Sequence, residues 1–245
     1  MTMKLMNVML ASFCLLNIHT SFAHSKIQGG EGKTILVFSP HPDDDVIGCG
    51  GTILQQIKAG SKVIIIYLTS GENSCWPGGK EELAILREKE AQEAANKLGV
   101  SELIFLRKPD SGLSGRINET IPEVKDLIAK YVPHYIFIPH EHDNHKDHSA
   151  ANSIVTAAFK EALASQNELK QCTMLGYEVW TPIQHITHTT NISSDMAHKI
   201  QALSEHKTQT KYIDYVGAIE ALNKYRGIMV LFDKFAECFK EIKSN

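Results

Sequence analysis

Four short runs of apolar and β-branched residues, separated by longer stretches of helical character, constrain the fold of this chain more than any other feature. The runs are Thr34–Phe38, Val63–Leu68, Leu103–Leu106 and Tyr135–Ile138. A strand that is apolar on both faces must be covered on both faces, and this pattern is typical of a parallel sheet between two layers of helices. We therefore predict an α/β fold built on a mostly parallel sheet.

The stretches between these runs have helical periodicity or composition, and right-handed crossovers through them give a Rossmann-like, doubly wound arrangement. Beyond the fourth run we expect two further strands and three further helices. No internal repeat, low-complexity tract or linker divides the 245 residues, so we predict a single domain. The expected helices are Val46–Ala59, Glu81–Leu98, Ile121–Tyr131, His148–Ala164, Asp195–His206 and Tyr215–Tyr225, and the further strands are Val179–Trp180 and His185–Thr189.

The first 23 residues differ from the rest in composition. Lys4 carries their only charge, the run Leu5–Leu16 is apolar apart from two residues, and Ser21-Phe22-Ala23 supplies small residues at a cleavage site. This order is typical of a secretory signal. We predict a signal peptide over 1–23 and an exported domain over 24–245, periplasmic or secreted after cleavage near Ala23. The apolar run is too short for a membrane span and no longer one follows, so we expect no span.

Charge and cysteine content exclude several classes of function. Lys and Arg together number 25 against 28 Asp and Glu, and no cluster of five basic residues occurs. A nucleic-acid partner is therefore not expected. The cysteines after the predicted cleavage site are Cys49, Cys75, Cys172 and Cys238, and no CxxC pair supports a thiolate zinc site. We interpret them as small buried hydrophobic residues, and leave open whether any of them forms a disulfide.

Two loops concentrate histidine and aspartate. The first, Ser39–Asp45, follows the first predicted strand, and the second, Pro139–His148, follows the fourth. In a doubly wound sheet the ligand binds beyond the carboxyl ends of the strands, which is where both loops lie. Two such loops at one sheet edge predict a functional site rather than two solvated loops.

The spacing within these loops suits a catalytic metal, which takes three protein ligands and keeps one position open. His41 and Asp44 are three residues apart on a tight turn that enters a helix, and His148 at the start of another helix completes the set. Asp43 is then left free beside the metal. We predict that this carboxylate is the general base that takes a proton from the attacking water.

His145 precedes His148 by three residues and is expected to face the same cavity. As an imidazolium it would polarise the substrate carbonyl or protonate a leaving amine. Asp147 is expected to accept a hydrogen bond from a ring nitrogen and fix the orientation of that histidine.

The motif His41-Pro42-Asp43-Asp44-Asp45, together with His145-x-x-His148, resembles the PIG-L/LmbE-like zinc-dependent N-acetylglucosaminyl deacetylase family. The resemblance extends over residues 34 to 240. Weaker similarities to that family lie at Thr69–Glu72, at Arg87–Ala91, at Pro109–Gly112 and at Ala236–Phe239.

The resemblance implies a hydrolase that removes the N-acetyl group from an N-acetylglucosamine-containing substrate and releases acetate and a free amine. It implies that His41, Asp44 and His148 hold the metal. Asp43 would then be the general base, and His145 the acid and carbonyl stabiliser. The resemblance adds Arg87 and Asp110 as residues that hydrogen-bond sugar hydroxyls. The implied cofactor is Zn²⁺, with Fe²⁺ or another divalent metal as the alternative. A small amino sugar or glycan is the expected partner, while the aglycone and the oligomeric state stay open.

Other functions share part of this residue pattern. Two histidines and one carboxylate also form the metal site of non-haem iron(II) oxygenases, but the spare acid Asp43 has no task in oxygen activation. A non-catalytic carbohydrate-binding module is the second alternative, and the presence of both Asp43 and His145 argues against it. A dinucleotide site after the first strand is not supported, because residue 53 is Ile where the motif requires Gly.

Overall fold

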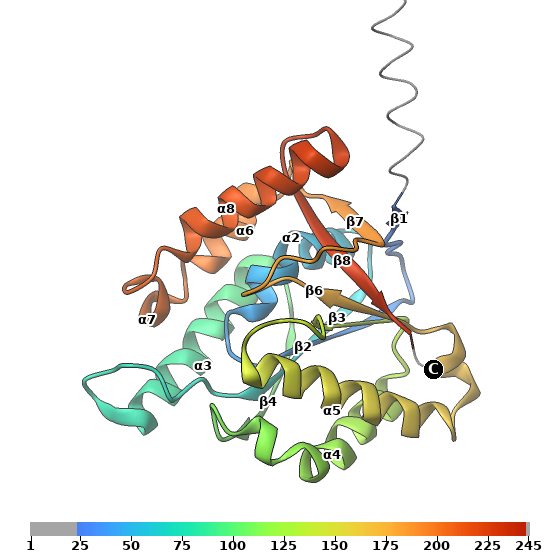
Figure 1. Ribbon diagram of the computed structural model, residues 1–245, viewed down its shortest axis with the longest axis horizontal. Coiled ribbons are helices and arrows are strands. Elements are labelled where there is room, and N and C mark those ends of the chain that lie inside the picture. The colour runs from blue at the N-terminus through green and yellow to red at the C-terminus, as the bar shows by residue number, and fades with distance from the viewer. Residues whose placement is uncertain (1–23, 244–245) are drawn as a thin grey trace, which may run out of the picture.

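The structure, a computed structural model, describes residues 24–243. The predicted signal peptide, residues 1–23, lies outside the described residues. Within the described part, one sheet of eight strands runs through the molecule and helices cover both of its faces (Figure 1). The predicted α/β class and the doubly wound sheet are confirmed.

The strands are ordered β1-β7-β8-β6-β5-β2-β3-β4 across the sheet. Strand β8 is antiparallel to both of its neighbours, and the other paired strands are parallel. The chain therefore starts the main sheet in its middle, at β2, and builds outward in both directions. The bounds are β1 Ser25–Lys26, β2 Thr34–Ser39, β3 Lys62–Thr69, β4 Glu102–Lys108, β5 Tyr135–Pro139, β6 Thr173–Tyr177, β7 His188–Asn191 and β8 Ala236–Ile242.

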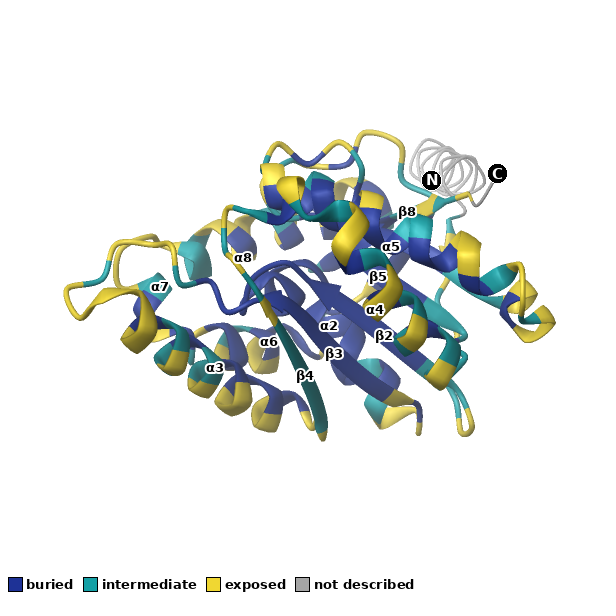
Figure 2. Cartoon of the chain, turned by 90° about the horizontal axis from the view of Figure 1, so that it is seen from below, coloured by how far each residue is buried: buried dark blue, intermediate teal, exposed yellow. Residues whose placement is uncertain are grey.

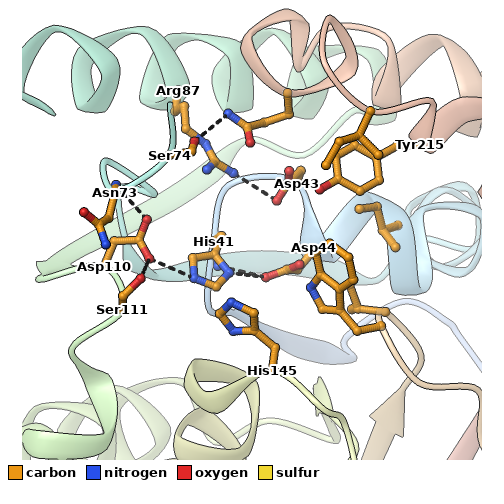
Figure 3. A pocket seen from close by; sticks show the side chains of 15 residues that line it. His41, Asp43, Asp44, Asn73, Ser74, Arg87, Asp110, Ser111, His145 and Tyr215 are labelled. Carbon is orange, nitrogen blue, oxygen red and sulfur yellow. Dashed lines mark hydrogen bonds and ion pairs between the residues drawn. The ribbon is translucent and has the colours of Figure 1, made fainter. Parts of the chain in front are cut away.

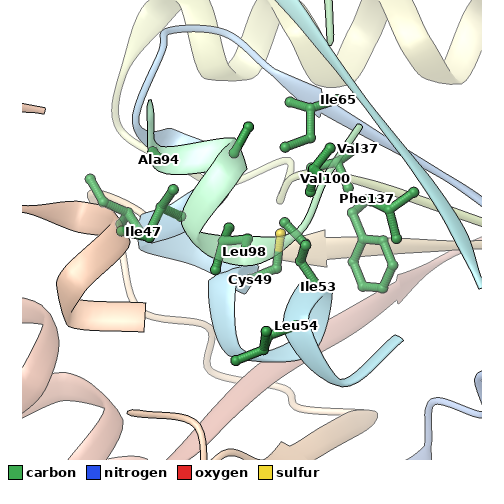
Figure 4. Close-up of a cluster of buried hydrophobic side chains, with 14 of the residues drawn as sticks. Val37, Ile47, Cys49, Ile53, Leu54, Ile65, Ala94, Leu98, Val100 and Phe137 are labelled. Atoms are coloured by element: carbon green, nitrogen blue, oxygen red, sulfur yellow. The ribbon is translucent and has the colours of Figure 1, made fainter. Parts of the chain in front are cut away.

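Two separate hydrophobic clusters form on the two faces of the sheet. Ile35 and Val37 of β2 face the cluster that contains residues of α2 and α3, a part of which is drawn in Figure 4. Leu36 and Phe38 face the cluster that contains residues of α4 and α5. The central strands are buried on both faces as predicted (Figure 2). The helices are α2 Asp44–Lys58, α3 Gly79–Leu98, α4 Ile117–Tyr131, α5 Lys146–Leu163, α6 Met196–Leu203, α7 Lys207–Thr210 and α8 Tyr215–Arg226, with short turns η1 Leu113–Gly115, η2 Asn167–Gln171 and η3 Gly227–Leu231.

Some predicted elements are wrong. Residues 179–180 are not a strand, because the backbone N–H of Trp180 donates to the Asp143 carboxylate instead of to a neighbouring strand. The predicted helix Asp195–His206 ends at Leu203, and the short helix α7 follows. Strands β6 and β8 had no prediction. In β8 the buried Glu237 interrupts the apolar pattern that marks the other central strands.

Helix α2, which begins at Asp44 within the first predicted metal loop, is broken at Cys49, whose φ of −146° is not helical. A break of this kind leaves helix carbonyl and N–H groups without their usual partners. The Lys199 ammonium donates to the freed carbonyl of Ile47 at 2.8 Å. The Glu237 carboxylate accepts from the backbone N–H of Gly51 at 2.9 Å and of Thr52 at 2.7 Å.

Lys199 and Glu237 also pair with each other, with Nζ 2.7 Å from Oε1, and both side chains are buried. Helix α6 and strand β8 thereby hold the start of α2 against the sheet. Gly48 serves the same close packing, because a Cβ there would lie 2.1 Å from the Tyr177 ring.

The four cysteines of the described residues are free thiols. Cys49 and Cys238 are buried, as expected, but the interpretation as buried hydrophobic residues is wrong for Cys75, which is exposed on the loop before α3. No helix among residues 24–243 is both long enough and apolar enough to cross a bilayer.

Candidate metal centre and active site

The two predicted metal loops meet at the carboxyl edge of the sheet. Strands β2 and β5 are paired in parallel, and the chain leaves them in opposite directions along the sheet. This is the switch point at which ligands bind in doubly wound folds. His41 and Asp44 follow β2, and His148 follows β5 in the first turn of α5.

The three predicted ligands present their donor atoms to one another. His41 Nδ1 lies 3.0 Å from Asp44 Oδ2, His148 Nε2 lies 3.2 Å from the same oxygen, and the two ring nitrogens are 3.3 Å apart. Ligands at zinc distances of about 2.0–2.1 Å in a tetrahedral arrangement are separated by roughly 3.3 Å. The triangle of donor atoms therefore fits a small divalent cation.

The outer nitrogens of both histidines face carboxylates. His41 Nε2 lies 3.2 Å from Asp110 Oδ1 and 3.5 Å from Asp147 Oδ2, and His148 Nδ1 lies 3.3 Å from Asp143 Oδ1. Carboxylates in this position commonly fix the tautomer and direct the inner nitrogen to a metal. Asp147 is itself held by the backbone N–H groups of Ser111 and Leu113.

The electrostatics of this group favour a cation. Burial acts against the charged ring, but hydrogen bonds to carboxylates, Asp110 first, hold the pKa of His41 well above its usual value. In the same way Asp44 and Asp143 raise the pKa of His148 to about 9. Burial raises the pKa of Asp44, yet His148 and His41 keep it well below its usual range. A bound metal ion would supply the positive charge that the two histidines otherwise provide when they are protonated.

Two other sets of donor atoms in the described residues lie within 4.8 Å of one another, namely His41, His145 and His148, and His41, Asp110 and Asp147. We prefer the set with Asp44, because its donor atoms lie 3.0, 3.2 and 3.3 Å from one another and its carboxylate offsets the charge of the metal. In that set the Asp110 and Asp147 carboxylates keep their hydrogen bonds to the far side of His41.

Asp43 lies beside this triangle and outside it. Its Oδ1 is 3.1 Å from Nη2 of Arg87, and both side chains are buried. Burial raises the pKa of Asp43 to about 6, although Arg87 acts to lower it. A carboxylate that titrates near neutrality and does not ligate the metal suits general-base work.

Arg87 on α3 connects three segments around the site. Besides its ion pair with Asp43, it donates to the carbonyl oxygens of Gly71 and Pro42, each at 3.0 Å. Arg87 and Asp110 both line the cleft, and their contacts with sugar hydroxyls stay a prediction. Asp110 also accepts from the backbone N–H of Asn73 at 2.8 Å.

His145 caps helix α5 and lies against His41, with ring centroids 5.0 Å apart. Its Nδ1 accepts the backbone N–H of Asp147 at 3.3 Å, so the proton of a neutral ring sits on Nε2. Burial lowers the pKa of His145 below its usual value. The neutral ring can therefore donate one hydrogen bond into the cleft, whereas the predicted imidazolium would need a second proton.

The cleft has a volume of about 260 Å³ and opens over His41, Asp43 and His145 (Figure 3). Several of its walls had no prediction from the sequence. They come from the loop before α3, the loop after β6 and the segment from α7 to the start of α8, and include Asn73, Ser74, Val179, Gln209, Ile213 and Tyr215. Trp180, which the sequence left between sugar stacking and core packing, is half-exposed at the same cleft. Asp143 was also missed, although its position five residues before His148 in the same loop was a usable signal.

Comparisons with known proteins agree with this geometry. The sequence model of the PIG-L family, described as GlcNAc-PI de-N-acetylase, matches residues 36–159, just over half of the chain. The chain belongs to the PIG-L family. The matched residues include both metal loops, and the predicted family is confirmed.

Relatives of this PIG-L protein match it over most of its length. An uncharacterised deacetylase, YaiS of Escherichia coli K12, is 26% identical over 186 residues, which are 72% of this chain and 91% of the relative. The diacetylchitobiose deacetylase of Thermococcus kodakarensis is 29% identical over 188 residues, which are 72% and 70% of the two chains.

A solved structure supports the same fold. The crystal structure of the conserved protein TT1542 from Thermus thermophilus superposes with a TM-score of 0.73 at 28% identity, covering 86% of this chain and 95% of that chain. None of these comparisons supports an oxygenase or a carbohydrate-binding module without catalysis.

Proposed function

We propose that this protein is a metal-dependent hydrolase that removes the N-acetyl group from an N-acetylglucosamine-containing substrate and yields acetate and a free amine. The observation that carries the proposal is the triangle of His41, Asp44 and His148 with Asp43 next to it and His145 at the cleft. The names of its relatives, which include a diacetylchitobiose deacetylase, support the same reaction.

A divalent metal held by this triangle would polarise the amide carbonyl and lower the pKa of a water molecule. We propose zinc, since two imidazoles and one carboxylate are a common zinc set, with Fe²⁺ as the alternative. Reconstitution of the metal-free protein with each ion in turn tests that choice.

In the proposed reaction Asp43 takes a proton from the attacking water molecule while the oxygen of that water bonds to the acetamide carbon. Nε2–H of His145 donates a hydrogen bond to the carbonyl oxygen, where negative charge develops. The carbon–nitrogen bond then breaks and the amine takes up a proton. The proton that Asp43 received balances this step, so the neutral His145 is sufficient as a stabiliser.

The buried Arg87 keeps Asp43 in place, and together with Asp110 it faces the space where sugar hydroxyls would lie. We assign sugar binding to both residues. Asp147, through its contact with His41, keeps that ring directed at the metal position.

Acetate release from N-acetylglucosamine and from N,N′-diacetylchitobiose tests the proposed function. Release that requires added metal and is lost in Asp43→Asn supports it. Failure of the metal-loaded protein to release acetate from any N-acetylglucosamine conjugate in a broad panel would refute it.

A further inference from the structure

Trp180 is an exposed aromatic residue on a loop that is held unusually firmly. Its backbone N–H donates to Asp143 Oδ2 at 2.9 Å, which ties it to the metal loop. The next residue, Thr181, accepts from the Asn144 backbone on its hydroxyl at 3.0 Å, and its carbonyl lies 2.7 Å from Nε2 of His140. The position of Trp180 is thus coupled to the loop that carries His145 and His148.

The other end of the same loop is fixed as well. The Glu178 carboxylate pairs with the buried Arg226 of α8 and accepts the backbone N–H of Ile183 at 2.6 Å. A loop pinned at both ends, with its largest side chain left 51% exposed, presents that side chain rather than burying it. Contiguous exposed apolar surface marks ligand-binding grooves, and Trp180 lines the cleft together with the exposed Ile213 and with Tyr215.

The Trp180 indole forms one wall of the cleft. It lies nearly parallel to His145, with ring centroids 6.3 Å apart and planes at 20°, and Tyr215 meets it edge-on at 6.2 Å. The opposite wall is polar and holds Asp110 and Ser111. Figure 3 shows these two on one side of His41 and Tyr215 on the other.

Such a cleft, apolar on one side and polar on the other, matches a pyranose ring, which has C–H groups on its faces and hydroxyls at its edge. The volume of about 260 Å³ lies below the roughly 300–1,000 Å³ of most small-ligand pockets. The cleft is therefore small, and the half-exposed indole of Trp180, which continues from its wall to the rim, is placed to contact a second ring that extends beyond it.

We propose that Trp180, supported by Tyr215, is the stacking platform for the sugar ring next to the one that loses its acetyl group. The substrate class is then an amino-sugar oligosaccharide of two or more rings, rather than N-acetylglucosamine on a small acyclic group. This inference rests on the proposed function and names the substrate of that same site.

The chain has two tryptophans, Trp76 and Trp180, so the variant Trp76→Phe makes Trp180 the sole indole reporter. Trp76 lies outside the cleft, on the loop before α3. In this background we expect N,N′-diacetylchitobiose to change the emission of Trp180 at concentrations where N-acetylglucosamine does not. An equal response to both sugars, or none while acetate is released, would overturn the inference.

Kinetics give a second measurement. In Trp180→Ala the ratio of kcat/KM for the disaccharide to that for the monosaccharide should fall about 10-fold, and Trp180→Phe should restore most of it. Tyr212→Ala is the matched control, because Tyr212 is exposed to a similar degree but does not line the cleft. An unchanged ratio in Trp180→Ala would overturn the inference. Absence of acetate release by the wild type would instead count against the proposed function, and the emission measurement would still report on sugar binding.

Discussion

The Arg87 guanidinium lies 3.1 Å from the Asp43 carboxylate, and both groups are buried beside the candidate metal centre. The one side chain that we assign to proton transfer is therefore held by the positive charge of a buried guanidinium. This pairing connects helix α3 to the chemistry, so changes at either residue should alter the pH dependence of the reaction.

Asp43→Asn should retain the metal and the fold but lower deacetylation at least about 100-fold, because general-base catalysis contributes typically 10²–10⁴-fold. The pKa of Asp43 is raised to about 6, and a base works only when ionised, so wild-type kcat/KM should decline as pH falls through this value. Initial rates between roughly pH 4.5 and 9 on a metal-loaded protein measure both effects, because this range spans the raised pKa of Asp43. Near wild-type turnover in Asp43→Asn would contradict the mechanism.

Arg87→Ala should move the low-pH limb of kcat/KM to higher pH. Arg87 lowers the pKa of Asp43, so its removal raises that pKa and leaves less carboxylate at neutral pH. Metal content should not change, since Arg87 contacts none of the three ligands. Arg107→Ala is the control, because Arg107 makes an exposed ion pair with Glu88. An unchanged low-pH limb in Arg87→Ala would show that Arg87 does not lower the pKa of the catalytic Asp43.

His148→Ala should abolish tight binding of one divalent metal per chain, whereas His145→Ala should keep it. His148 Nε2 faces Asp44 and His41, while Nδ1 of His145 is already used by the backbone N–H of Asp147. Elemental analysis after chelation and reconstitution distinguishes the two variants. The exposed His142 supplies a control, His142→Ala, that should leave the stoichiometry intact. Stoichiometric metal in His148→Ala would show that the assigned triangle is wrong.

Glu237→Gln should lower the free energy of unfolding by about 3–5 kcal/mol, since it leaves the Lys199 ammonium buried without its partner charge. A surface counterpart, Glu119→Gln, breaks the exposed pair with Arg116 and should cost no more than about 1 kcal/mol. Urea unfolding at neutral pH compares the variants. Equal losses of unfolding free energy in the two variants would show that the buried ion pair stabilises the fold no more than the exposed one.

The exported form should begin at His24, as the signal pattern of residues 1–23 implies. Intact-mass measurement of protein recovered from the cell envelope or the medium checks this. A full-length N-terminus in that fraction would contradict the predicted signal peptide.

The sequence predicted the metal loops because their information is local. His41 and Asp44 are three residues apart, as are His145 and His148, and both pairs follow strands whose apolar runs are unmistakable. Rules for parallel sheets then bring the two loops together without any knowledge of side-chain packing.

Other parts of the site depend on distant contacts and were not predictable. The charged Glu237 obscured a central strand because its partner, Lys199, is 38 residues away and is itself buried. Trp180 was taken for a strand residue because nothing near it in sequence reveals that Asp143, 37 residues earlier, captures its backbone N–H. The tautomer of His145 likewise follows from a backbone contact and not from residue type.

Strand β8 is the last strand along the described chain, yet it lies inside the sheet, between β6 and β7. Until it is in place, both of those strands present open edges, and the break in α2 lacks the carboxylate that accepts its free N–H groups. Ribosomes deliver this strand after the other strands of the sheet. The turn that carries His41 and Asp44 can therefore take its final form only after β8 has been synthesised, so two segments 186 residues apart must come together before the candidate metal centre is complete.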